Sequence, residues 1–107
     1  MNQQVCDMRQ RLDFIERTIT HAARACDADR RTPAELKHFI TQLEWHSHKT
    51  RRALEAHDRS AIRAHLEDLA QASERAQSAI APKHDFALKS AVILAHIEVS
   101  ALKLQAA

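Results

Sequence analysis

The chain has 107 residues, of which 45% are hydrophobic and 28% charged, and its formal net charge is +2. This length allows one domain with one modest core, and so mild a charge excess does not indicate nucleic-acid binding. Glycine is absent, which excludes glycine-rich phosphate loops and disfavours the tight hairpin turns of β-proteins. The composition therefore predicts an all-α fold.

The first predicted helix covers residues 3–28. Its apolar residues recur at alternating intervals of three and four, which is typical of a helix with one buried stripe. They are Val5, Met8, Leu12, Ile15, Ile19, Ala22 and Cys26. We expect Cys26 to be buried and Cys6, which lies off the stripe, to be exposed. Phe14 also lies off the stripe and is a candidate interface residue. On one helix the two thiols would lie about 30 Å apart, too far for an intrachain disulfide.

The second predicted helix covers residues 33–56. Thr32 is expected to cap it, Pro33 to take its first position and Glu35 to complete a capping box. Its stripe has a polar middle and consists of Leu36, Ile40, Leu43, Ser47, Thr50 and Leu54. Trp45 projects opposite this stripe, and tryptophan is enriched in protein interfaces, so it is a candidate interface residue. The alternative is a half-exposed indole covered by long side chains.

A turn is predicted at His57 and Asp58, followed by a helix over 59–80. Asp58 is a good N-cap, and His or Asp tolerates a left-handed backbone better than most residues. The next apolar stripe is one residue out of phase with the preceding one and consists of Ile62, Leu66, Leu69, Ser73, Ala76 and Ile80. One long kinked helix is the alternative.

The last predicted helix covers residues 84–105 and is apolar around most of its circumference. Its polar stripe consists of Asp85, Lys89, His96, Ser100 and Lys103. We expect Ile93, Ile97 and Leu104 to face the core of the same chain. We expect a second apolar stripe to pack against another chain, since large exposed apolar patches mark interfaces. That stripe consists of Leu88, Val92, Val99 and Leu102. The alternative is a central helix shielded by its neighbours.

All three connections are short, which favours antiparallel neighbours. The sequence therefore predicts an antiparallel up-down-up-down four-helix bundle in a single domain, 1–107. The predicted core contains Val5, Leu12, Ile15, Ile19, Leu36, Ile40, Leu43, Leu54, Ile62, Leu66, Leu69, Ile80, Ile93 and Ile97.

A basic run follows Trp45. Basic side chains near a helix C-terminus are expected from the helix dipole alone, and Glu44 and Glu55 are close by, so we do not expect a nucleic-acid site. His46-x-x-Lys49 is similar to part of the motif of histidine-containing phosphotransfer domains. That resemblance implies a phosphate-accepting His46, but Thr50 stands where the motif has glycine.

A small polar pocket is a further hypothesis. Ser47 and Thr50 are expected to face the third helix, with His46 and His65 on the rim of a ligand site. The alternative is that the hydroxyls bond back to their own helix. No two histidines stand four residues apart, the spacing of a helical zinc site, so we predict neither a metal nor a cofactor. A mixed site of His65 with His46 or Asp68 stays open.

No catalytic constellation can be argued from the residue pattern, and we predict that the protein is not an enzyme. The N-terminus lacks the features of a signal peptide, no apolar stretch is long enough to cross a membrane, and two unpaired thiols fit a reducing compartment. We therefore predict a cytoplasmic helical bundle that acts through self-association and protein–protein contacts, with a homodimer as the first expectation. The alternative is a ligand- or metal-binding regulatory bundle that uses the histidine patch.

Overall fold

The structure is a computed structural model that describes residues 2–106, and all four predicted helices are present in it. They are α1 (Asn2–Ala28), α2 (Ala34–Glu55), α3 (Arg59–Ser78) and α4 (Phe86–Ala106). The bundle that they form is elongated, with extents of 45 × 19 × 18 Å. Each predicted boundary lies within two residues of the observed one. The fold prediction is confirmed.

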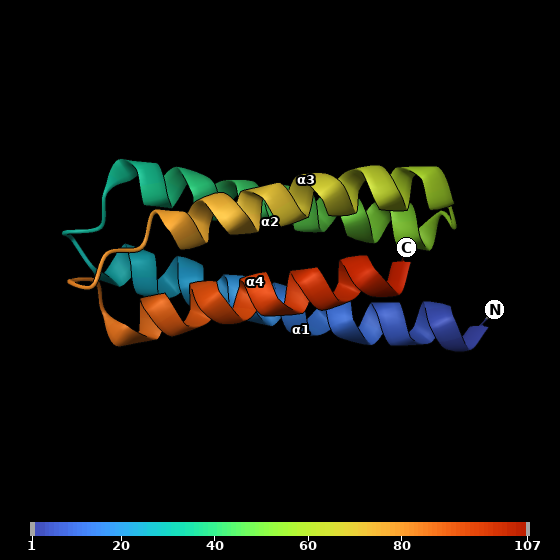
Figure 1. The fold of residues 1–107 in the computed structure, drawn as a ribbon, viewed down its shortest axis with the longest axis horizontal. Helices are drawn as coiled ribbons and strands as arrows, with labels where there is room; N and C mark the ends of the chain where they lie inside the picture. The colour runs from blue at the N-terminus through green and yellow to red at the C-terminus, as the bar shows by residue number, and fades with distance from the viewer. Residues whose placement is uncertain (1, 107) are drawn as a thin grey trace.

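Consecutive helices run in opposite directions around the bundle. Figure 1 shows the α1–α2 and α3–α4 connections at one end, and both termini with the α2–α3 turn at the other. At that second end, Gln4 of α1 donates a hydrogen bond to the carbonyl oxygen of Gln105 in α4. Within the described residues, α1 contacts α2 and α4 but not α3, and α2 does not contact α4. The pairs α1–α3 and α2–α4 therefore lie diagonally across the bundle.

One continuous core runs along the bundle axis, and the stripes of α1, α2 and α3 enter it as predicted. Cys26 is buried and Cys6 is exposed, also as predicted. Val5 and Ile80 are only partly buried and pack against the edge of the core. The largest fully buried side chains are Leu12, Ile15, Ile19, Leu36, Ile40, Leu43, Leu66, Leu69, Leu88, Val92, Val99 and Leu102.

The start of α2 differs from the prediction. Pro33, with extended backbone angles, occupies the cap position, and its carbonyl oxygen accepts from the amides of Leu36 and Lys37. Thr32 is buried, and its hydroxyl accepts no hydrogen bond from the first amides of α2. The predicted capping box is therefore wrong. Pro33, and not Thr32, is the N-cap residue, so the Thr32 side chain is one residue too early to cap α2.

The turn at His57 and Asp58 is confirmed. His57 has a φ of 55°, in the left-handed region. The amides of Asp58 and His57 bond to the carbonyl oxygens of Ala53 and Leu54, which is the Schellman pattern of a helix C-terminus. The Asp58 carboxylate then accepts from the amide of Ala61 and caps α3. The α2–α3 hairpin therefore needs no glycine: His57 takes the left-handed conformation, and Asp58 directly after it caps α3.

Candidate interaction surface

The outer face of α4 carries most of the exposed large apolar side chains. Among the described residues, Phe86 and Leu104 are each 78% exposed, close to the two ends of the helix. Ile93, Leu94 and Ile97 are exposed between them. Phe86, Ile93, Ile97 and Leu104 fall on one side of a helix at 100° per residue, and Leu94 lies beside them. This apolar face runs along nearly the whole helix.

The predicted phase of α4 is wrong. Leu88, Val92, Val99 and Leu102, which we expected to face a second chain, are buried in the core of the same chain. Ile93, Ile97 and Leu104, which we assigned to the core, face outward. The two apolar stripes have exchanged roles.

The polar stripe of α4 explains this error. Two of its residues, His96 and Lys103, lie at the edge of the groove with α3 instead of marking the solvent-facing side. The His96 ring atom Nδ1 lies 3.0 Å from Ser73 Oγ, and Lys103 Nζ lies 2.8 Å from the Glu67 carboxylate. As the residue number rises along α4, its partner's number falls along α3, as antiparallel packing requires. In the sequence, the serine in the apolar stripe of α3 was the feature that could have indicated the phase of α4, because the buried Ser73 hydroxyl contacts His96.

Trp45 and Phe14 are exposed, as expected of residues that lie off their stripes. The Nζ atom of Lys49 lies 4.7 Å from the centre of the Trp45 ring, within the range of a cation–π contact. Arg17 lies similarly over Phe14. Trp45 belongs to α2, the helix diagonal to α4, so it does not share one flat surface with the apolar face of α4. Phe14 belongs to α1, which borders α4.

The four residues of the predicted polar pocket are close together, but their hydroxyls are engaged or buried. Thr50 donates to the carbonyl oxygen of His46, one turn back, and Ser47 is buried beside it. His46 and His65 are half-buried on facing sides of α2 and α3, and their Nδ1 atoms are buried without a partner among the described residues. Burial lowers the pKa of His46, an effect that the Asp68 carboxylate opposes. The ligand site itself stays a prediction.

Several potentially reactive side chains are buried in the bundle, whereas the Cys6 thiol is exposed. Within residues 2–106, no three His, Cys, Asp or Glu side chains are grouped so that they could hold a metal ion. Ser73, which contacts His96, is buried and donates its hydroxyl proton to the carbonyl oxygen of Ala70. Burial raises the pKa of the Cys26 thiol, which disfavours the nucleophilic thiolate.

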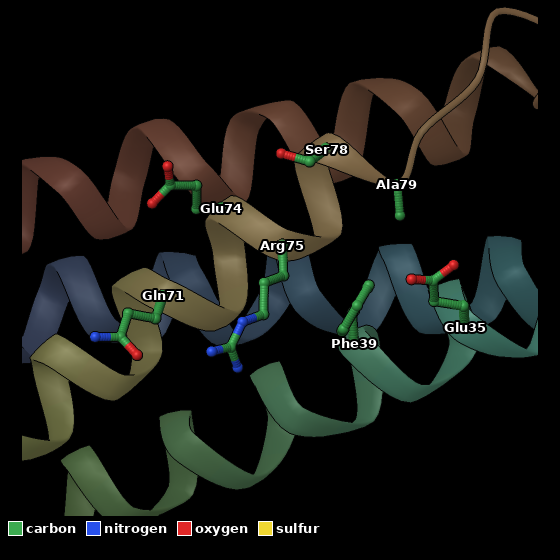
Figure 2. A pocket seen from close by; sticks show the side chains of 7 residues that line it. All are labelled: Glu35, Phe39, Gln71, Glu74, Arg75, Ser78 and Ala79. Carbon is green, nitrogen blue, oxygen red and sulfur yellow. The ribbon is translucent and has the colours of Figure 1, made fainter.

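Two hollows on the surface have mixed charge. The first, of about 520 Å³, lies between the first turns of α2 and the last turns of α3. It is lined by Glu35, Phe39, Gln71, Glu74, Arg75, Ser78 and Ala79. Figure 2 shows Arg75 extending from α3 toward α2. The second, of about 450 Å³, follows the surface of α1 from Asp13 to Arg24. Both combine carboxylates with arginines, so neither favours a ligand of one charge.

The third hollow, of about 340 Å³, lies at the end of the bundle where the two termini and the α2–α3 turn meet. It is lined by Gln4, Val5, Met8, Leu54, His57, Arg59, Ile62, Arg63 and Ala106. Sequence reasoning missed it, because its lining comes from all four helices and from the turn. None of these three hollows is lined by the four residues of the predicted polar pocket.

Comparisons with known proteins supply no relative. No protein-family model matches the chain, and neither the curated proteins nor the solved structures give a match. No helix in the described part of the chain has the length and hydropathy needed to cross a membrane. Functional inference therefore depends on the surface of this bundle alone.

Proposed function

We propose that the protein is a non-enzymatic cytoplasmic bundle that pairs with a second copy of itself through the outer face of α4 and acts through protein contacts. The observation that carries this proposal is the apolar outer face of α4. A helix of an isolated four-helix bundle normally shows water a wide polar face. Here large apolar side chains are exposed along α4, and the helix has few charges to cover them.

The spacing of the outward residues suits pairing between two helices. We define the outer seam of α4 as Phe86, Ser90, Ile93, Ile97, Ser100 and Leu104. These positions follow one another at intervals of four, three, four, three and four, the spacing of a coiled-coil stripe. The seam runs along the side of α4 opposite the buried stripe, and it has an apolar centre and apolar ends.

The outer seam is also symmetric about its own midpoint, Ala95. Phe86 and Leu104 are equally distant from it, as are Ser90 and Ser100, and Ile93 and Ile97. If two copies of α4 pair antiparallel about a two-fold axis at this point, Phe86 of one copy faces Leu104 of the other. In the same way, serine faces serine and isoleucine faces isoleucine. A two-fold interface must be self-complementary in this way, which favours a second copy of the same chain as the occupant.

The area available is enough for a modest interface. Taking about 200 Å² for a fully exposed large side chain, the exposed apolar residues of α4 present on the order of 600 Å² per chain. A standard interface covers roughly 800 Å² per partner, and the flanks of α1 and α3 would supply the remainder. Phe14 is the candidate for the α1 flank, because it is exposed on a helix that borders α4 and is level with the middle of α4, counting from the Gln4–Gln105 hydrogen bond. We expect a dimer that depends on protein concentration.

Light scattering at micromolar concentration tests the proposal. Replacing Ile93 and Ile97 together with Glu should convert a dimer into a monomer while the helical circular dichroism is kept, because both side chains are exposed. Trp45→Glu is the control, since it places a charge of the same sign on an exposed apolar site of the diagonal helix. A wild-type monomer, or dissociation by Trp45→Glu alone, would contradict pairing through α4.

The alternative, a regulatory bundle that binds a ligand or metal at the histidine patch, has one observation in its favour. His46 and His65 both have a buried Nδ1 atom that lacks a partner among the described residues. Such atoms can be satisfied by a ligand donor or a metal ion. A thermal-shift screen with Zn²⁺, Ni²⁺ and phosphate esters separates the two proposals. A rise in Tm that His65→Gln abolishes would support the alternative, and no rise would oppose it.

A further inference from the structure

The hollow at the end of the bundle where the two termini lie has an apolar floor. Met8 of α1, Leu54 of α2 and Ile62 of α3 are buried beneath it, and Val5 is half-buried at its side. These side chains come from three helices, so the floor exists only in the folded bundle. It offers apolar surface to the body of a small molecule.

The rim of this hollow is positively charged. Arg59 and Arg63 stand one turn apart on α3, and His57 stands in the turn before them. The lining contains no Asp or Glu. In the part of the chain that the structure describes, neither arginine has a carboxylate within ion-pairing distance. Both guanidinium groups therefore remain available to an anion.

Two of the carboxylates near these arginines in the sequence have hydrogen-bond or ion-pair partners elsewhere. Asp58 accepts a hydrogen bond from the amide of Ala61 as the cap of α3. Glu67, one turn beyond Arg63, binds Lys103 of α4, and that hydrogen bond lowers the pKa of Glu67. Asp58 keeps its negative charge beside Arg59, but among the described residues neither Asp58 nor Glu67 forms an ion pair with Arg59 or Arg63.

We propose that this hollow binds a small amphipathic anion, a carboxylate on a short unbranched apolar body. The apolar body lies on Met8, Leu54 and Ile62, and the carboxylate lies between Arg59 and Arg63, whose guanidinium groups match its two oxygens. A water molecule occupies about 30 Å³ of liquid, so the hollow holds roughly eleven atoms of that size, about the size of octanoate. The site is independent of pairing through α4, since it uses a different surface.

The test uses octanoate as the probe, followed by isothermal titration calorimetry and by NMR shifts of the Met8 and Ile62 methyl groups. Octanoate should bind and shift both methyl groups. Octanol, which lacks the charge, and acetate, which lacks the apolar body, should each bind at least about tenfold more weakly, since losing one charge-assisted hydrogen bond or a few buried methylenes has that effect.

The double variant Arg59→Gln with Arg63→Gln should weaken octanoate binding about tenfold or more. The matched control is Arg24→Gln with Arg30→Gln, which removes two exposed arginines near the opposite end of the bundle. This control should bind octanoate like the wild type. Three results would each overturn the site: no binding of octanoate, octanol binding as tightly as octanoate, or equal weakening in both double variants.

Discussion

Arg51 of α2 binds Glu16 of α1 across the groove between the two helices. Its Nε atom lies 3.0 Å from both carboxylate oxygens, and its terminal nitrogen also reaches Asp13, one turn earlier in α1. The hydrogen bond to Glu16 raises the pKa of Arg51 above its ordinary value. In the sequence this arginine was one member of a basic run. In the structure it ties two helices together.

Replacing Arg51 with Ala should lower the free energy of unfolding by about 1 kcal/mol, the upper range for a partly exposed pair with good geometry. Arg52→Ala is the matched control, since the neighbouring side chain is exposed, and it should change stability by less than about 0.5 kcal/mol. Urea denaturation measures both. Molar salt screens the ion pair, so it should reduce the difference in the free energy of unfolding between Arg51→Ala and Arg52→Ala. Equal losses would show that the Arg51 contacts contribute nothing specific.

The observed phase of α4 predicts opposite results for two nearby leucines. Leu102 is buried and Leu104 is exposed. Leu102→Ala should cost about 2–5 kcal/mol, the usual range for a buried leucine, whereas Leu104→Ala should cost less than about 0.5 kcal/mol. The denaturation should be done at submicromolar concentration, where self-association contributes least. A larger loss of stability for Leu104→Ala than for Leu102→Ala would mean that the stripe containing Leu104 is the buried one, as the sequence analysis expected.

The α2–α3 turn should respond to two substitutions in opposite directions. Asp58→Ala removes the carboxylate that caps α3 and should cost about 1 kcal/mol. His57→Gly relieves a left-handed backbone and should raise stability by up to about 1 kcal/mol. Thermal unfolding of the two variants against the wild type measures both effects. Destabilisation by His57→Gly would mean that the imidazole makes a contribution larger than the backbone strain.

The lowered pKa of His46 makes stability depend on pH. Burial is the main cause, Asp68 opposes it, and Lys49, His65 and Arg75 add to it. Because the folded pKa lies below the unfolded value of about 6.5, the unfolded chain takes up a proton first as pH falls. Stability should therefore fall from pH 7.5 toward pH 5, and less steeply in His46→Gln. Parallel stability curves for the two proteins would contradict this assignment.

Disulfide trapping tests the antiparallel arrangement separately from dimerisation itself. In a Cys6→Ser background, Ser90→Cys and Ser100→Cys chains are oxidised alone and as an equimolar mixture. The antiparallel seam brings residue 90 of one copy to residue 100 of the other, within the short Cα separation that a disulfide needs. The mixture should therefore cross-link and the single variants should not. Cross-linking of each variant alone would indicate a parallel pair instead.

The heptad spacing in the sequence was sufficient to determine the stripes of α1, α2 and α3. In each of these helices one apolar stripe stands against a polar remainder, so only one face can leave water. The turn at His57 and Asp58 was also predictable, because the two apolar stripes flanking it are out of phase. The back-bonding of Thr50 to His46 follows from the local chemistry of a hydroxyl in a helix.

Only the tertiary structure decided which stripe of α4 is buried. Leu88 and Val92 compete with Ile93 and Ile97 at nearly equal hydrophobicity, so burying either pair removes similar apolar area from water. The observed phase goes with two contacts to residues distant in the sequence, His96 with Ser73 and Lys103 with Glu67. The end hollow is likewise a property of the assembled bundle, because its apolar floor comes from three helices, of which only α3 also carries the arginine rim.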